Sequence, residues 1–333
     1  MQDYELNSIL EQYDIAVSGT RKTRGAILCD TDKGLFLLKE VDISQAKVPA
    51  LLGLYEHLKD QGYTQVDFPV KNREGEYISL TEEGSRFMLR RWASGRECDI
   101  RKASELLKAS GNLAKLHILM RGGSGQRAPA AVPMKEEYMR HNRELKKVRK
   151  FMRSVSPKGE FEFAFLKYFD SMYQWADAAV NLLEDSDYEK LYKESIELSH
   201  VTHGEYNYHN IMMGASPSSG ILMTTNFERC KKDVQLEDLY YFLRKVLEKQ
   251  GWKERLGDNI INAYSAIKPV SSAEMEYLKI RFIYPEKFWK VADSYYRSNK
   301  AWISVKSIEK MNVAIRQTEE KERFLNHIFS FCM

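Results

Sequence analysis

The feature that most constrains the fold is a change in hydrophobic pattern near residue 93. Before it, short runs typical of strands dominate. Residues 24–30 and 35–41 flank a Gly-containing turn, and residues 77–92 hold a second predicted hairpin. After it, the pattern is helical. This predicts an α+β fold with two lobes, a small β-rich lobe over 1–93 and a larger, mostly helical lobe over 94–333.

Apolar residues at helical spacing place one helix in the first lobe, residues 48–62, and several in the second. The predicted helices of the second lobe cover residues 103–120, 135–153, 161–185, 236–250, 257–267, 272–297 and 304–331. A helical insertion is expected over about 121–198. It opens with a loop of Gly, Ser, Ala and Pro at 121–133, which follows a helix rather than a strand and is therefore interpreted as a linker, not a phosphate loop.

The composition of the chain argues against several classes of partner and site. With 51 basic and 47 acidic residues the formal net charge is +4, too balanced to indicate nucleic-acid binding. No run approaches the ~18 apolar residues of a membrane span. The N-terminus lacks the basic start and apolar run of a secretory signal. The four cysteines form no CxxC pair, which argues against structural zinc and fits a reducing compartment.

The predicted helix at 135–153 carries eight Lys or Arg residues against three Glu. Two interpretations stay open. It is either an ordinary solvated helix face or a docking surface for an acidic partner.

The segment with the most chemical information runs from His203 to Asn210, HGEYNYHN, between two short apolar runs. About sixteen residues later a second apolar run ends at Asn226, and a strongly amphipathic helix begins near Leu236. The neighbouring histidines lack the spacing of a helical zinc motif, and no cysteine accompanies them.

This arrangement resembles the catalytic core of the aminoglycoside phosphotransferase and choline kinase superfamily, whose pattern is HGDxxxxN, a hairpin and then a D-F/W segment. Longer stretches, HGEYNYHNIM, TTNFERCKKDVQLEDLYYFLRKVLEK and RGAILCDTDKGLFLLKE, look like the CotS family of spore coat proteins. The resemblance covers nearly the whole chain. It implies a protein-kinase-like fold and, if the protein is active, ATP and Mg²⁺ as cofactors, because phosphoryl transfer needs a lysine and a metal to neutralise phosphate charge.

The resemblance also assigns roles to residues in the first lobe. Lys39, at the end of FLLK, matches the phosphate-binding lysine, and Glu56 on the following helix matches the glutamate that holds it. The loop Ser18–Gly25 would cover the phosphates, but its Arg24 and neighbouring basic residues fit equally well with direct phosphate contacts or with an exposed basic hairpin.

In the second lobe, Glu205 matches the general base, and Asn210 matches a metal ligand. His203 shares the catalytic motif and is expected to orient the loop rather than transfer protons. Asp238 matches an aspartate that braces this loop, with a helix-start carboxylate as the alternative. His117 is expected to be a packed histidine.

Two of these positions depart from the family pattern. Glu205 replaces Asp, which moves the carboxylate by about 1 Å and can cost on the order of a hundredfold in rate. Asn226 replaces the metal-binding Asp and removes a formal charge from a site that depends on anionic oxygens. Glu228 could supply the missing carboxylate, because residues i and i+2 of an extended segment point the same way; the alternative is a surface acid.

These departures lead to two functional hypotheses. In the first, the protein is a spore coat component, made in the mother-cell cytoplasm and assembled onto the coat with other coat proteins. Its kinase-like fold then serves as a degenerate phosphotransferase used as a scaffold or binding module. In the second, it is an active ATP-dependent kinase of a small hydroxylated or sugar-like acceptor. Neither hypothesis involves nucleic acid or a membrane span.

Overall fold

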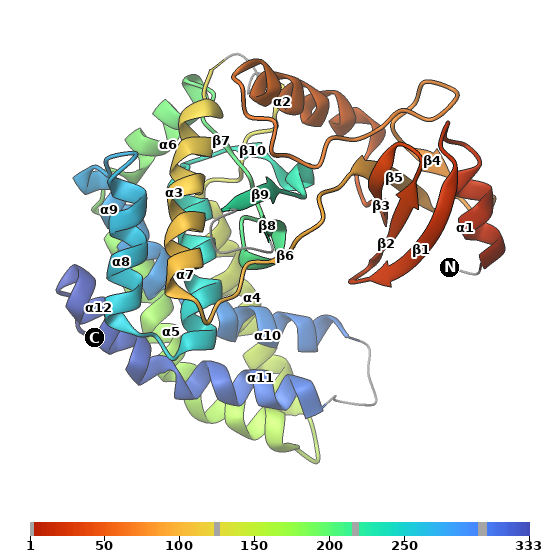
Figure 1. Ribbon diagram of the computed structural model, residues 1–333. Helices are drawn as coiled ribbons and strands as arrows, with labels where there is room; N and C mark the ends of the chain where they lie inside the picture. The colour runs from red at the N-terminus through yellow and green to blue at the C-terminus, as the bar shows by residue number, and fades with distance from the viewer. Residues whose placement is uncertain (1–2, 123–126, 215–219, 299–304) are drawn as a thin grey trace.

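The computed structural model describes residues 3–122, 127–214, 220–298 and 305–333, and it has the two-part architecture expected from the sequence (Figure 1). A small antiparallel sheet forms the N-terminal part, and the rest is mostly helical. The predicted α+β, bilobal fold class is therefore confirmed.

The N-terminal sheet has five strands in the order β1-β2-β3-β5-β4. Their bounds are β1 Val17–Thr23, β2 Ala26–Thr31, β3 Gly34–Glu40, β4 Ser79–Leu80 and β5 Arg86–Arg91. Residues 18–25 are not all loop: most of them form β1, which pairs with β2 around the turn at Arg24 and Gly25, so of the two interpretations the exposed basic hairpin is the arrangement seen. In the central strand β3, Lys39 faces Ala26 on one side and Met88 on the other.

Two helices accompany this sheet. The helix α1, Asp3–Leu10, was not predicted, and its Leu6, Ile9 and Leu10 pack on the inward residues of the sheet in a small separate core. The helix α2, Val48–Asp60, begins with Pro49 in its first turn, as expected. Its buried residues, apart from Ala50, belong to the main core that runs through the helical part, so α2 ties the two parts together.

The helical part contains α3 Ala103–Leu119, α4 Met134–Ser154, α5 Glu160–Glu184, α6 Tyr188–Glu197, α7 Leu236–Gln250, α8 Glu254–Ser265, α9 Ser272–Ile283, α10 Glu286–Arg297, α11 Val305–Arg316 and α12 Thr318–Phe329. The single helices predicted at 272–297 and 304–331 are each divided in two. Pro285 causes the first break, because proline cannot donate the backbone hydrogen bond that would continue α9. None of the helices in the described residues is long and apolar enough to cross a membrane.

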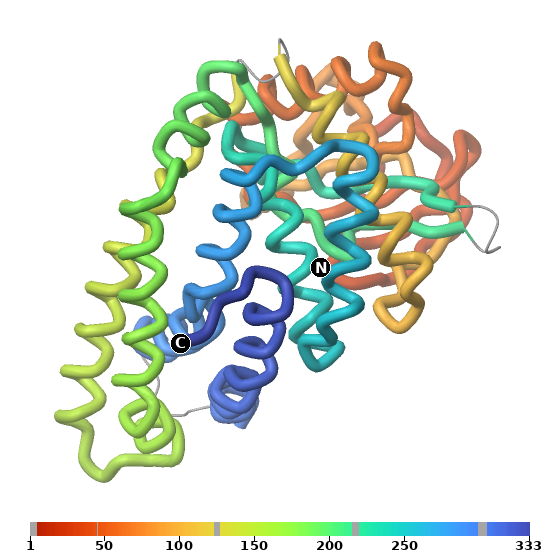
Figure 2. Tube along the Cα trace, turned by 90° about the vertical axis from the view of Figure 1, so that its left-hand side faces the viewer, coloured from red at the N-terminus to blue at the C-terminus, as the bar shows by residue number. Residues whose placement is uncertain are grey.

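The long helices α4 and α5 lie side by side and project from the body of the molecule (Figure 2). Their apolar faces form a second core with α10 and α11, in which Phe165 stacks on Phe288. The segment where the sequence predicts an insertion, 121–198, contains α4, α5 and α6, and its residues 123–126 lie outside the described part of the chain.

Short strands position the polar loop between the two parts. The strands β6 Arg96–Glu97, β8 Ile211–Met213 and β9 Ile221–Thr224 form a three-stranded sheet, and β7 Val201–Thr202 pairs with β10 Lys231–Lys232. Because β7 leads into the loop and β8 leaves it, both ends of residues 203–210 are held by backbone hydrogen bonds.

Candidate functional site

The loop that begins at His203 is held in place by a carboxylate on α7. Asp238 accepts hydrogen bonds from the backbone amides of His203, at 2.6 Å, and Gly204, at 2.9 Å. Gly204 has φ +83°, and a Cβ there would lie 2.1 Å from the carbonyl oxygen of Arg229, so no other residue fits. The prediction that Asp238 braces the loop beginning at His203 is confirmed.

Two buried histidines support this loop through contacts with other protein groups. His117 contacts Asp238 at 3.1 Å and the hydroxyl of Tyr264 at 2.7 Å, which confirms the predicted packed histidine. Burial lowers its pKa despite the nearby carboxylate. His203 contacts the carbonyl oxygen of Thr225 at 2.9 Å and accepts from the amide of Glu205 at 3.2 Å. With both ring nitrogens engaged and no exposed surface, His203 orients the loop.

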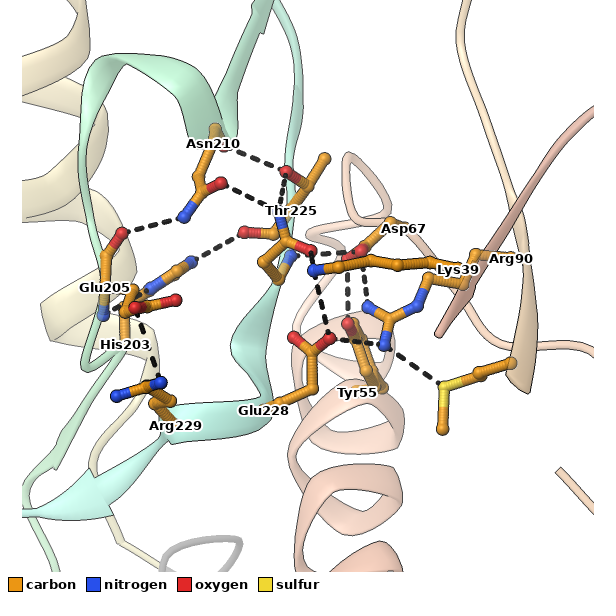
Figure 3. A network of polar contacts seen from close by, with 12 residues as sticks. Lys39, Tyr55, Asp67, Arg90, His203, Glu205, Asn210, Thr225, Glu228 and Arg229 are labelled. Atoms are coloured by element: carbon orange, nitrogen blue, oxygen red, sulfur yellow. Dashed lines mark hydrogen bonds and ion pairs between the residues drawn. The ribbon is translucent and has the colours of Figure 1, made fainter. Parts of the chain in front are cut away.

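A line of polar side chains joins the sheet to the loop (Figure 3). Lys39 Nζ donates to Asn226 Oδ1 at 2.6 Å, and Asn226 Nδ2 donates to Asn210 Oδ1 at 2.7 Å. Asn210 Nδ2 then donates to the carbonyl oxygen of Glu205 at 2.9 Å. The structure therefore brings together four of the residues that the sequence analysis placed in one site.

The direction of these hydrogen bonds is set by the chemistry of their donors. A lysine ammonium can only donate, so the Asn226 atom beside Lys39 must be its oxygen. The Asn226 amide nitrogen then faces Asn210, whose oxygen is the group left to accept, because its own nitrogen donates to Glu205. The hydrogen bonds from Lys39 to Asn226 and from Asn226 to Asn210 are therefore consistent with each other. They fix which atom of each amide group is the oxygen and which is the nitrogen.

This network does not fit a bound Mg²⁺. Magnesium binds oxygen ligands, preferably carboxylates, and the two amide oxygens expected to hold it each accept a hydrogen bond from the protein. A cation held by both residues would have to lie between the side chains of Asn226 and Asn210. In the structure an N–H group of Asn226 occupies this place and donates to the oxygen of Asn210. Nor do three or more His, Cys, Asp or Glu side chains gather as a metal-binding group anywhere in the described residues.

The third predicted metal ligand, Glu228, is engaged by cations of the sheet. Its Oε1 accepts from Arg90 at 2.7 Å and lies 3.7 Å from Lys39 Nζ. The argument from an extended segment is wrong, because residues Phe227–Arg229 form a 3-10 turn. Burial opposes ionisation of Glu228, but Arg90 and Lys39 outweigh it and lower its pKa. Glu228 therefore acts as the counterion of these two residues.

Arg90 stands at the centre of a buried charge cluster that the sequence analysis missed. It also binds Asp67 Oδ2 at 2.7 Å, and Asp67 accepts from the hydroxyl of Tyr55 at 2.7 Å (Figure 3). Asp67 Oδ2 accepts from the backbone amide of Asn226 as well, at 3.0 Å. A signal for Arg90 was present, since in a strand it faces the same side as Met88, two residues earlier. Asp67 lies in an irregular segment and offered no such signal.

The expected partnership of Glu56 with Lys39 is not seen. Glu56 lies on the exposed face of α2, and among the described residues the carboxylate within 4 Å of Lys39 is that of Glu228. The neighbouring Tyr55 is the α2 residue that points toward the site. The helical spacing explains the difference, because Leu51, Leu54, Tyr55 and Leu58 occupy the buried face and leave Glu56 outside.

Glu205, the predicted general base, is partly exposed. Its Oε1 lies 3.4 Å from Arg229 Nε, and more than a third of its side chain is accessible to solvent. Its backbone is held by the hydrogen bonds described above, whereas its carboxylate has Arg229 beside it and is partly exposed to solvent.

Arg24 reaches the loop from the other lobe. It lies in the turn between β1 and β2, and its guanidinium is 2.8 Å from the ring of His209, which also contacts Glu97. The turn therefore closes over the loop, and Arg24 faces the cavity between the lobes.

Two cavities meet at this site. The first, called here the interlobe cavity, has a volume of about 890 Å³ and lies between the sheet residues Ala26 and Leu28 and the loop residues after Glu205. The second, the α4-side cavity, has about 790 Å³ and extends toward Met134 and Arg140. Lys39 and Glu205 line both cavities. Ala26, Leu28 and Met212 give the interlobe cavity apolar lining, and Lys39 lines it as well.

Comparison with known proteins gives the chain a family. A family model described as "Spore coat putative kinase YutH" matches residues 6–328. Among curated proteins, "Spore coat protein S" of Bacillus subtilis (strain 168) is 23% identical over 325 residues, covering 94% of this chain and 89% of that protein.

Two solved structures that share this fold are phosphotransferases by their own descriptions. An aminoglycoside phosphotransferase from Alicyclobacillus acidocaldarius superposes with a TM-score of 0.83 at 16% identity, covering 97% of this chain and 95% of its own. A spectinomycin phosphotransferase in complex with ADP and spectinomycin gives a TM-score of 0.68 at 11% identity, covering 96% of this chain and 99% of its own. At these identities the likeness establishes the fold.

Proposed function

The chain belongs to the YutH family of spore coat kinase-like proteins, and we propose from this premise that it is a coat protein whose degenerate phosphotransferase site serves as a binding module. The proposal combines the family with the geometry of the site. Under this proposal the protein binds a ligand in the interlobe cavity and does not transfer phosphoryl groups efficiently.

The observation that carries this proposal is the hydrogen-bonded line from Lys39 through Asn226 to Asn210. In an active phosphotransferase the metal neutralises charge on the transferred phosphoryl group. Here an amide N–H occupies the direction that a metal-binding carboxylate oxygen would take. The longer side chain of Glu205, half-exposed beside Arg229, adds a second departure at the base position.

We also propose that the protein is made in the mother-cell cytoplasm and assembles onto the spore coat with other coat proteins. Its family and its relative named "Spore coat protein S" support this. The exposed face of α4 supports it too, because Arg143, Lys147 and Lys150 are exposed and form no salt bridge within the described residues. Such a face suits an acidic surface of another coat protein.

An active kinase is the second candidate, and one observation favours it. Lys39 and Glu205 line both cavities, so a nucleotide in the interlobe cavity and a small hydroxylated acceptor in the α4-side cavity would meet at these residues. In that case Glu205 would act as base, and Asn210, Asn226 and Glu228 would hold Mg²⁺ after their present hydrogen bonds were exchanged.

Release of ADP from ATP separates the two candidates. The purified protein is assayed with Mg²⁺ and a panel of hydroxylated and sugar-like acceptors, beside Lys39→Ala and the double variant Glu205→Asp with Asn226→Asp. The proposal predicts no ADP release by the native protein above the Lys39→Ala background, and measurable release by the double variant. Acceptor-dependent release by the native protein that Lys39→Ala abolishes would make it a working kinase.

A further inference from the structure

The interlobe cavity has an unusually basic lining. Among its described residues six are basic and two are acidic. The basic residues are Arg24, Lys39, Arg96, Lys245, Lys249 and Lys310, and the acidic ones are Glu97 and Glu205. The α4-side cavity, by contrast, is balanced, with six basic and seven acidic side chains among its described residues. The positive charge is therefore specific to one of the two cavities and favours an anionic ligand there.

One face of α7 supplies much of this charge. Tyr241, Lys245 and Lys249 follow one another at intervals of four and all line the cavity, as expected for residues on a single helix face. Lys310, on α11, faces the same space. Burial raises the pKa of Tyr241, and the charge of the Glu205 carboxylate raises it further, so the two side chains lie near each other. The lysine face therefore extends outward from the base position.

These lysines lack carboxylate partners in the described structure. Lys245, Lys249 and Lys310 form no salt bridge there, whereas Arg96 in the same cavity binds Glu105 at 2.5 Å. Burial and the neighbouring Arg244 lower the pKa of Lys245, and the opposite effect of Glu248 does not compensate. A half-buried ammonium among other cations is unfavourable, so an anion in the cavity would stabilise it.

The cavity also has a side suited to a flat apolar group. Ala26 and Leu28 of β2 face it, while the alternate residues Ile27 and Cys29 are buried in the core under the sheet. Met212 of β8 lines it from the other lobe. An aromatic base between these surfaces would leave its phosphates at Lys39.

We propose that the interlobe cavity binds a polyphosphate anion in its metal-free form, with Lys39 and the α7 lysines Lys245 and Lys249 supplying the positive charge that Mg²⁺ supplies in active phosphotransferases. The inference deepens the proposed function and rests on it, because the metal position offers neutral amide oxygens that already accept hydrogen bonds from Lys39 and Asn226. Nucleoside triphosphates and inorganic polyphosphate share this chemistry, and the apolar side of the cavity favours the nucleotide.

Calorimetric titration of the full chain tests the inference, with ATP, tripolyphosphate and adenosine each added in EDTA and in Mg²⁺. ATP is expected to bind in EDTA at least as tightly as in Mg²⁺. The double variant Lys245→Ala, Lys249→Ala is expected to weaken that binding about tenfold or more, because each substitution removes a charge-assisted contact with the anion. The matched control is Lys147→Ala, Lys150→Ala on the exposed face of α4, which should bind as the native protein does.

The separate titrations identify the ligand and show which results would overturn the inference. Tripolyphosphate binding as tightly as ATP supports an inorganic polyanion as the ligand. Adenosine binding as tightly as ATP, ATP binding that requires Mg²⁺, or equal binding by the α7 variant and the native protein would each overturn the inference. If the alanine double variant does not fold, the variant Lys245→Gln with Lys249→Gln replaces it. Glutamine removes the charge and keeps most of the aliphatic part of each side chain. ADP release is followed in the same samples, because turnover would contradict the proposed function separately from any result on metal-free binding.

Discussion

Replacing Arg90 by methionine should destabilise the fold strongly at neutral pH. The Arg90 side chain is fully buried and binds two carboxylates, Asp67 and Glu228, each at 2.7 Å. Asp67 is also fully buried, and only 16% of the Glu228 side chain is exposed. Methionine nearly fills the same volume but leaves both carboxylates without their main cation.

The size of the effect follows from this burial. Breaking a buried ion pair by removing one partner costs about 3–5 kcal/mol, because the remaining charge is uncompensated. Asp67 keeps its hydrogen bonds from Tyr55 and from the amide of Asn226, and Glu228 keeps Lys39 at 3.7 Å. Because these contacts remain, we expect Arg90→Met to lower the free energy of unfolding by an amount within that range, although two carboxylates are affected.

The loss should depend on pH in a defined direction. Despite burial, Arg90 and Lys39 lower the pKa of Glu228 from 4.5, so in the native protein it contributes stability above that pH and loses it as the pH falls through the lower folded value. In the variant, burial without Arg90 raises the pKa of Glu228, and protonation relieves the penalty. The difference between the two proteins should therefore narrow as the pH falls from 7 toward 4.5.

Urea denaturation followed by circular dichroism at both pH values measures the free energy of unfolding. Arg91→Met is the matched control, because Arg91 is the exposed neighbour on β5, and its change should stay within about 0.5 kcal/mol. Adding Glu228→Gln to Arg90→Met should recover part of the loss. A change of less than about 1 kcal/mol for Arg90→Met at neutral pH, or an equal deficit at both pH values, would refute the reasoning.

Two further substitutions probe the loop and the helical part. Gly204→Ala should lower the free energy of unfolding by more than about 2 kcal/mol in urea denaturation, because its Cβ would lie 2.1 Å from the Arg229 carbonyl oxygen at a positive φ; a near-native value would contradict the tight contact. His141 is buried and stacked on Trp289, and burial lowers its pKa to about 4, so the native protein should lose stability as the pH falls from 6.5 toward 4. His141→Phe should show a smaller loss over that interval in thermal melts, and an unchanged pH profile would rule out this histidine as the cause.

The sequence predicted the larger features of the fold because they repeat over many residues. The helix at 236–250 was predicted with the bounds that α7 has, since its apolar periodicity is strong and Gly251 ends it. The strand β1 was missed because Val17–Thr23 is almost wholly exposed and carries no alternating apolar residues. The division of 272–297 at Pro285 could have been read from the proline itself.

The candidate site was predicted in part, through the resemblance more than through the pattern. Lys39 lies on the central strand as expected, and it meets Asn226 and Asn210 across the two lobes. Which carboxylate would face Lys39 could not be predicted, because this depends on the rotation of α2 and on the 3-10 turn after Asn226. The catalytic and binding roles of these residues stay predictions until they are measured.

The central claim, that the amide of Asn226 excludes the metal, is tested most directly by Asn226→Asp. Asn226 has φ 67°, a conformation that aspartate also tolerates, so the substitution changes the site without straining the backbone. ATP affinity is measured by calorimetry with and without Mg²⁺ for both proteins. The account predicts that Mg²⁺ strengthens ATP binding by Asn226→Asp and not by the native protein. An equal gain from Mg²⁺ in both proteins would contradict it.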